Sequence, residues 1–528
     1  MKAIGFKNFR RFENFPTMEL GGVTMLVVGN NSGKSTVVKA ALLMQNFLHT
    51  TAVDYLNSGS LYPLFSFDVD DAHIGVFKNA LFNKATDDVV EFSFQKEDFF
   101  FVVNVAGDKN EVNLSHTFGR VIFIEIIDIN QGIKYTFDYN SNRMSFSFGG
   151  KENPMFEAQM AQLKKLFAEK EREFKKLFED LHADPNTKLA QFENLKALEV
   201  EMNDTKERMN SIEELWAKSS ASETIDLPLS ISETRQNGSF IESLIRYFIN
   251  YGESPILSTL DKRSKEYKQL ETSKNVLKSQ RKLLENTIEQ INTAIAVPLK
   301  YIYAHIARQE TVYLASDKND YMAQTLHSYK KQRIQPGDPE HEFVKRWMPK
   351  FEIGADFEIG SIDAEAYTLD IIDEDGSKMS LGSKGMGSIQ MMVLLLQLAS
   401  LMKQYKGEKV LKPVVMIEEP EQNLHPKLQS ILADLFACIS EEYRFQFIIE
   451  THSEYLVRKT QVLLAEGIRD KQITIEENPF KVYFLPKDGA CFDMEYQPSG
   501  RFKNKFDAGF FDEANKYSLE LMRIERGL

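Results

Sequence analysis

The segment Val27–Thr36, VVGNNSGKST, constrains the fold more than any other part of the chain. It follows an apolar run, Val23–Val28, and opens the helical pattern TVVKAALLMQ. A buried strand that turns through small residues into a helix presents backbone N–H groups and the positive end of the helix to phosphate oxygens. The sequence therefore predicts a phosphate-binding loop between a strand and a helix, in an α/β fold.

Within this loop, Lys34 is predicted to contact the β- and γ-phosphates of a nucleotide, and the Ser35 hydroxyl to bind Mg²⁺. The strict form of the motif has its first glycine at the position of Val28, whereas this chain has it at Gly29. The other predicted phosphate contacts are Gly29, Asn30, Asn31, Ser32, Gly33 and Thr36.

A second motif, PVVMIEEPEQNLHP, runs from Pro413 to Pro426 and places two adjacent acids after an apolar run. We predict that Glu418 holds Mg²⁺ through water and that Glu419 polarises the attacking water, because consecutive side chains at a strand end can serve different sites. A solvated acidic strand end is the alternative. Glu421 is expected to stabilise a helix or an interface, and His425-Pro426 to mark the start of a helix.

A third motif, FQFIIETHSEYL, is another apolar run followed by a polar turn that contains His452. A neutral imidazole at this place could donate a hydrogen bond to the γ-phosphate and sense its loss. A purely structural histidine is the alternative. The order of the three motifs favours the functional interpretation.

The three motifs together resemble the ABC-type ATPase heads of the SMC, RecF and OLD group, which includes many bacterial phage-defence ATPases. The resemblance covers residues 1–150 and 301–490. It implies an α/β P-loop NTPase head that binds ATP and Mg²⁺ and hydrolyses ATP, with Glu419 and His452 as the catalytic residues and with Ser35 and Glu418 at the metal.

The same resemblance gives a role to SLGSKGMGSIQ, which precedes the apolar stretch MMVLLLQLASLM. In the family, the equivalent glycine-rich segment reaches across a head-to-tail dimer to the γ-phosphate of the partner's ATP. Gly385, Gly387 and Ser388 would make this contact, using close backbone approach and a helix N-terminus. The family's usual Ser-Gln is Ile389-Gln390 here, and a simple helix cap is the alternative.

The first hairpin, at Asn8-Phe9-Arg10-Arg11, also resembles the family. The resemblance implies that a basic residue there, Arg10, packs near the nucleotide base; a charged strand face is the alternative. Gln95 is a candidate for the glutamine that the family places in its Q-loop.

The 528 residues are too many for one ordinary core, which predicts domains or an insertion. We predict a first lobe over 1–150 and a second over 301–490, with a small closing segment over 491–528 that ends in an amphipathic helix. Three heptad-like stripes between 151 and 300 predict an inserted antiparallel coiled-coil arm. A compact helical bundle is the alternative.

The net charge of −13 argues against a surface that is basic all over, but it allows a local basic groove. Cys438 and Cys491 lack a C-x-x-C pattern, so neither a disulfide framework nor a structural zinc site is expected. We find neither a signal peptide nor a long uncharged apolar stretch, and therefore expect a cytoplasmic protein without a membrane partner.

The leading functional hypothesis is an ATP-switched homodimer, or a higher oligomer, that controls an effector protein such as a nuclease or toxin in antiphage defence. The alternative is a DNA-repair or DNA-binding clamp, for which nucleic acid would be the partner. A third hypothesis, a sensor that hardly hydrolyses ATP, fits poorly with Glu419 and His452. The segment after His452 is shorter than the nuclease domain of OLD proteins, so we expect no nuclease in this chain.

Overall fold

The structure of the protein is a computed structural model. It describes residues 1–28, 33, 35–51, 62–108, 117–148, 223–229, 239–253, 265–302, 310–317, 320–363, 366–407, 412–486, 491–506, 511 and 513–525. Shorter described pieces are 167, 170–172, 174–175, 178, 198–199, 202–203 and 206.

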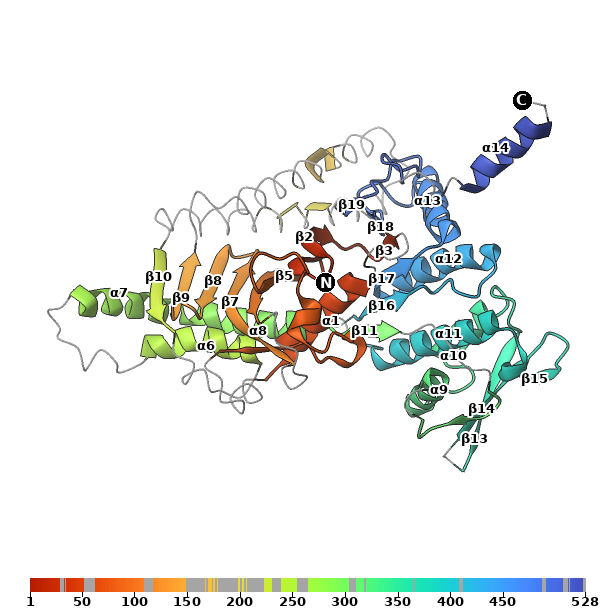
Figure 1. Ribbon diagram of the computed structural model, residues 1–528, viewed down its shortest axis with the longest axis horizontal. Helices are drawn as coiled ribbons and strands as arrows, with labels where there is room; N and C mark the ends of the chain where they lie inside the picture. Colours follow the sequence, from red (N-terminus) through yellow and green to blue (C-terminus); the bar gives the residue numbers. More distant parts are fainter. Residues whose placement is uncertain are drawn as a thin grey trace.

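An antiparallel sheet forms the first lobe (Figure 1). Among the described residues its order is β10-β9-β8-β7-β6-β5-β1-β2, and β4 pairs with β7. Buried and partly buried residues alternate along β5 and β6 because one face of the sheet covers a core. The bounds are β1 (Ala3–Phe9), β2 (Phe12–Glu19), β4 (Leu64–Ser66), β5 (Val89–Lys96), β6 (Phe99–Ala106), β7 (Phe118–Asp128), β8 (Ile133–Asp138), β9 (Arg143–Phe148) and β10 (Glu223–Pro228).

Asp128, at the end of β7, is a fully buried carboxyl in this lobe. Its Oδ1 accepts a hydrogen bond from the Gln131 N–H at 2.9 Å, and its Oδ2 has no hydrogen-bond partner among the described residues. Burial raises the pKa of Asp128 to about 6. The folded protein therefore keeps a proton on Asp128 between pH 4 and pH 6 that the unfolded chain has already released, so stability falls as the pH rises through this window.

We expect Asp128→Asn to stabilise the protein by about 1–2 kcal/mol at pH 7.5, because Asn keeps the acceptor and removes the buried charge. Urea unfolding at pH 7.5 and at pH 4 measures this, and the gain should vanish at the lower pH. Asp68→Asn, an exposed control, should change stability little at either pH. A destabilised Asp128→Asn protein at pH 7.5 would contradict the expectation.

The second sheet is parallel except at its last strand and has the order β11-β16-β17-β3-β18-β19. Its strands are β3 (Val23–Val28), β11 (Leu299–Ile302), β16 (Val414–Glu418), β17 (Gln446–Thr451), β18 (Phe480–Leu485) and β19 (Phe492–Asp493). The three apolar runs that precede the predicted motifs are thus neighbouring strands, β3, β17 and β16. β3 begins at residue 23 and pairs with β17, which begins at residue 446. Such a separation is compatible with parallel pairing, which needs a long crossover connection.

This parallel sheet lies between two hydrophobic cores, which is why its strands are continuously apolar. In β16, Met416 faces the core shared with the first lobe and Val415 faces the other core. Helix α1 (Ser35–His49) packs in the first core. The helices that pack in the second core include α11 (Met386–Gln404), α12 (Pro426–Tyr443) and α13 (Glu454–Arg469). The start of α12 at Pro426, directly after His425, confirms the predicted helix start.

The inserted arm needs a correction in its second half. Strand β10 pairs with β9 and so extends the first sheet, and α6 (Phe240–Glu253) packs Phe248 against Tyr135, Phe137 and Phe146. Helix α7 (Lys265–Ser279) leads into α8 (Arg281–Ala296), which buries its apolar stripe in the same core. This third stripe therefore packs in the core of the first lobe and against α6, so the described residues between 223 and 296 share that core although the first lobe was predicted to end at residue 150.

The first two heptad stripes, within 151–218, lie largely outside the described residues. The few positions described between 167 and 206 are helical, as the spacing predicts. The antiparallel arrangement of the arm stays a prediction.

A small unit of helices and strands lies between β11 and α11. It contains two helices, α9 (Tyr321–Lys331) and α10 (Pro339–Trp347), and a sheet of the order β12-β14-β13 with β15 on β14. Asp320 caps α9 by accepting two backbone hydrogen bonds, and Pro339 opens α10, so local signals for both helices were present. The strands are β12 (Tyr313–Leu314), β13 (Asp356–Ile362), β14 (Ala366–Ile372) and β15 (Lys378–Ser380).

Helix α11 is apolar on nearly all sides, and it is the one described helix long and apolar enough to cross a membrane. Most of its residues are buried in the second core, which accounts for this composition in a globular fold.

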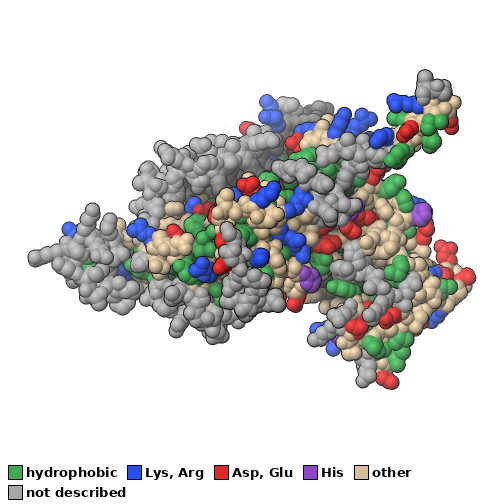
Figure 2. All heavy atoms as spheres, viewed as in Figure 1, with side chains coloured by type: hydrophobic (Ala, Val, Ile, Leu, Met, Phe, Trp, Pro, Cys, Tyr) green, Lys and Arg blue, Asp and Glu red, His purple; other side chains and the backbone are tan. Residues whose placement is uncertain are grey.

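The predicted closing segment, residues 491–528, is not separate from the second lobe at its start. Strand β19 pairs with β18, and Met494 belongs to the second core, so this part is continuous with the second lobe. The predicted final helix is present as α14 (Glu513–Glu525), which projects from the body in Figure 1 and carries exposed apolar side chains, green in Figure 2. The short elements are η1 (Asp70–Ala72), α3 (Phe77–Ala80) and η4 (Leu381–Ser383).

Candidate nucleotide site

The carboxyl ends of β16, β17 and β3 form one edge of the parallel sheet, and this edge gathers the predicted site residues. Glu418 pairs in register with Glu450, and Glu450 pairs with Leu26. Residues that follow these strand ends therefore project from the same edge, which is where open α/β sheets bind ligands. The structure thus brings Glu418, Glu419 and His452 to the edge at which β3 leads toward α1.

Part of the phosphate loop lies outside the described residues, namely Gly29, Asn30, Asn31, Ser32 and Lys34, whose predicted contacts stay predictions. Gly33 has φ +81°, and a Cβ on it would lie 2.2 Å from Cδ of Arg11. A side chain is excluded there both by the backbone conformation and by the available space.

Ser35 begins α1, as predicted, and Thr36 N–H donates to the carbonyl of Gly33 at 3.0 Å. The Thr36 Oγ1 is buried and has no hydrogen-bond partner among the described residues. A buried hydroxyl without a partner at a helix N-terminus fits a phosphate oxygen or another anionic ligand.

The first hairpin separates the roles of its two arginines. Arg10 has φ +56°, and burial lowers its pKa while the charge of Glu450 opposes that shift. Arg10 therefore lies toward the strand-end acids. Arg11, which the sequence did not single out, packs its chain on Gly33 and donates to the Pro486 carbonyl at 3.3 Å. The side chain that lies against the phosphate loop is that of Arg11, and the predicted contact of Arg10 with a base stays untested.

Glu418 is half-buried at the end of β16. Lys39 lies on the second turn of α1. Burial, together with the charge of Arg10, lowers the pKa of Lys39, and the charges of Glu418 and Glu450 partly oppose this shift. These mutual effects place the start of α1 and the acidic strand ends within electrostatic range of one another. This proximity is what a shared metal and phosphate site requires.

Glu419 and His452 form a pair across this edge. His452 Nε2 lies 3.4 Å from Glu419 Oε1. The His452 side chain is 30% exposed and the Glu419 side chain 25%. Glu419 has φ +45°, a strained conformation for a residue with a side chain, and its N–H donates to the Glu450 carbonyl at 2.7 Å. The turn thus directs Glu419 toward His452, where both can reach a ligand.

Glu421 was assigned to a helix or interface, but the structure places it beneath this pair. Its Oε1 accepts a hydrogen bond from the backbone N–H of His452 at 2.6 Å. Burial raises the pKa of the Glu421 carboxyl, and the hydrogen bond from His452 opposes that shift. The repeated acids of EEPE were the only sequence signal for this contact.

The predicted glycine-rich segment leads into α11. Gly385 is the residue before the helix, with φ −67° and no atom within 4 Å of a Cβ built on it. Gly387 instead packs against the connection after β16, because a Cβ there would lie 2.7 Å from the Asn423 carbonyl oxygen. Ser388 N–H donates to the Gly385 carbonyl. Packing inside this protomer therefore already explains why residue 387 is a glycine. Gly385, in contrast, borders open space.

Gln95 lies far from this site. It pairs with Ala3, at the end of β1 opposite to the Asn8–Arg11 hairpin. Its neighbour Lys96 donates to Gln45, which lies in the third turn of α1 rather than at its N-terminus. The suggestion that Gln95 is the Q-loop glutamine is therefore wrong for this arrangement, since hairpin pairing places it at the far end of the strand.

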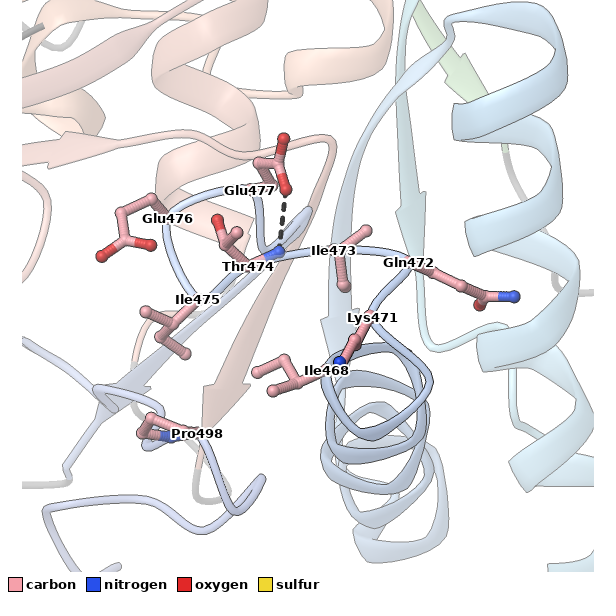
Figure 3. A pocket seen from close by; sticks show the side chains of 9 residues that line it. All are labelled: Ile468, Lys471, Gln472, Ile473, Thr474, Ile475, Glu476, Glu477 and Pro498. Carbon is pink, nitrogen blue, oxygen red and sulfur yellow. Dashed lines mark hydrogen bonds between the residues drawn. The ribbon is translucent and has the colours of Figure 1, made fainter. Parts of the chain in front are cut away.

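A pocket borders the opposite edge of the parallel sheet (Figure 3). It is formed by the connection from α13 to β18, where Thr474 N–H donates to Glu477 at 2.8 Å. Val23 N–H donates to Pro479, so this connection borders the amino end of β3, whereas the phosphate loop follows the carboxyl end. The pocket is separate from the nucleotide site. Its lining residues are Ile468, Lys471, Gln472, Ile473, Thr474, Ile475, Glu476, Glu477 and Pro498.

Comparison with known proteins identifies the protein family. The chain belongs to the AAA ATPase domain family AAA_15, whose model matches residues 1–457. Nucleotide binding and, in general, ATP hydrolysis are the properties of such a family. No curated protein matches this chain.

Two solved structures are similar at low levels. One is the Smc head domain with an extended coiled coil bound to the C-terminal domain of ScpA, from Pyrococcus furiosus, at 11% identity and TM-score 0.30, covering 99% of both chains. The other is an SmcHead bound to the C-winged helix domain of ScpA, at 10% identity and TM-score 0.32, covering 94% of this chain and 97% of that chain. Both similarities are too low to assign a role to any residue.

Proposed function

We propose that this chain is an ABC-type ATPase that forms a homodimer when it binds MgATP and separates after hydrolysis. The single observation that carries the proposal is the arrangement of the Glu419–His452 pair beside the strand that enters the phosphate loop. Membership of the AAA ATPase domain family supports the ATPase part.

In this proposal each residue has a separate task. Lys34 and the loop amides bind the β- and γ-phosphates, and Mg²⁺ would be held by Ser35 and, through water, by Glu418. When bound, Mg²⁺ neutralises charge on the phosphate oxygens. Glu419 orients the attacking water and accepts its proton, and His452 donates a hydrogen bond to the γ-phosphate. The buried Thr36 hydroxyl and the crowded Gly33 support phosphate binding at this loop.

The dimer would bring Gly385, Gly387 and Ser388 of one protomer to the ATP of the other. Since Gly385 borders open space and has an ordinary φ, Gly385→Glu should leave the fold intact. The added carboxylate would repel the partner's γ-phosphate. We expect this variant to bind ATP like the wild type but to remain monomeric, with hydrolysis lowered by about 10-fold or more.

Light scattering in the presence of a non-hydrolysable ATP analogue measures this effect, with nucleotide affinity measured in parallel. Ser361→Glu introduces the same charge on the exposed strand β13 and serves as the matched control. A wild-type mass that does not change with the analogue would refute the nucleotide-switched dimer. A Gly385→Glu variant that dimerises normally would remove this segment from the interface.

We further propose that the ATP-bound dimer, or a higher oligomer, controls a separate effector in the bacterial cytoplasm. The support is the resemblance of the three motifs to phage-defence ATPases. A nuclease or toxin gene beside the gene for this chain would favour the proposal. Binding to DNA with a steep dependence on salt would instead favour the clamp function.

A further inference from the structure

Glu421 is a buried carboxyl that the proposed reaction does not use. Only 7% of the residue is exposed, its Oε1 accepts a hydrogen bond from the His452 N–H at 2.6 Å, and the Thr451 side chain also interacts with this carboxyl. A carboxyl is costly to bury unless it is hydrogen-bonded, and the hydrogen bond from the His452 N–H ties Glu421 to the turn after β17. The contact is made to the backbone of the very residue whose imidazole faces Glu419.

The connection that carries Glu421, residues 419–425, is also held by α11, the helix that follows Gly385. Gln390 of α11 donates to the Pro420 carbonyl at 3.2 Å, and Asn423 donates to the Gln390 side chain at 3.1 Å. Gly387 packs against the Asn423 carbonyl oxygen. The connection therefore contacts α11 on both sides of Glu421, at Pro420 and at Asn423.

On its other side, the same connection is tied to the turn after β17. Ser453 donates to Gln429 at 2.6 Å, and Gln429 donates to the Leu424 carbonyl at 2.9 Å. Together with the Glu421–His452 hydrogen bond, these contacts make the 419–425 connection and the His452 turn one hydrogen-bonded unit. A shift of α11 that keeps these hydrogen bonds would move this unit with the helix.

We propose that Glu421 is a positioning residue for hydrolysis, which holds the backbone of His452 so that its ring faces Glu419 and makes this geometry depend on α11. The proposal rests on the proposed function, since it connects α11 of one protomer to the Glu419–His452 pair of the same protomer. In the dimer, contact of that helix with the partner's ATP would then influence the first protomer's hydrolysis.

The test compares two substitutions with opposite expectations. Glu421→Gln keeps an oxygen that can accept the His452 N–H, and it should retain kcat within about threefold. Glu421→Leu has a similar size but no acceptor, and it should lower kcat by about 10- to 100-fold, because small displacements of catalytic groups are costly. The KM for ATP should change by less than about twofold in both, because neither variant touches the phosphate loop.

A merely structural residue would not give this pattern. Equal losses in Glu421→Gln and Glu421→Leu, or a Leu variant with the wild-type kcat, would overturn the proposal. If Glu421→Leu does not fold, Glu421→Met takes its place, and failure of both to fold would assign Glu421 to stability alone. Wild-type protein without ATP hydrolysis would instead refute the proposed function, so the two failures are distinguishable.

Discussion

Glu419→Gln is expected to lower ATP turnover by about 100- to 1,000-fold while leaving ATP binding intact. Gln is nearly isosteric and can still hydrogen-bond water, but it cannot accept the proton of the attacking water. Glu419 lies 3.4 Å from His452 and is not part of the phosphate loop, so the substitution should spare nucleotide binding. Because ATP binds but is not cleaved, an ATP-dependent larger species should accumulate.

Phosphate release and light scattering, with and without MgATP, measure both parts of this result. Glu466→Gln removes the same charge from the exposed face of α13 and should behave as wild type in both measurements. Normal turnover by Glu419→Gln would exclude Glu419 as the general base. Loss of turnover without a larger species would retain the base and argue against the dimer.

Gly33→Ala is expected to weaken ATP binding by about 100-fold. At φ +81° a side chain costs roughly 1–2 kcal/mol, and the new Cβ would also displace the Arg11 chain from its place 2.2 Å away. The loop that must wrap the phosphates would therefore adopt another conformation. Equilibrium titration with a fluorescent ATP analogue measures the affinity, and chemical unfolding measures the stability.

Gly376→Ala is the matched control, because Gly376 has the same φ of +81° but no atom within 4 Å of an added Cβ. Both variants should lose about 1–2 kcal/mol of stability, whereas only Gly33→Ala should lose affinity. Unchanged ATP affinity in Gly33→Ala would show that the crowded contact with Arg11 does not shape the nucleotide site.

The sequence was most informative where a motif and its secondary structure depend on the same short segment. The strand, loop and helix around Gly33 are local, so apolar runs and small residues predicted β3 and α1 directly. The meeting of β3, β16 and β17 was predicted only through the resemblance, because parallel pairing over hundreds of residues leaves no local signal.

Sequence reasoning failed where tertiary packing decides between similar patterns. The stripe through Leu284, Ile288 and Ile291 suits a coiled coil as well as a globular core, and the structure buries it in the core of the first lobe. The choice between Arg10 and Arg11, and the contact of Glu421 with the His452 backbone, depend on turn geometry with positive φ angles at Arg10 and Glu419. Residue type alone carries no such information.

The most direct test of the central claim is steady-state phosphate release by the wild-type chain over a range of MgATP concentrations. The account predicts saturable release that requires Mg²⁺, since the edge formed by β3, β16 and β17 would then be a working hydrolytic site. Release that never exceeds the protein-free blank, even at millimolar MgATP, would contradict the assignment of Glu419 and His452 as its catalytic pair.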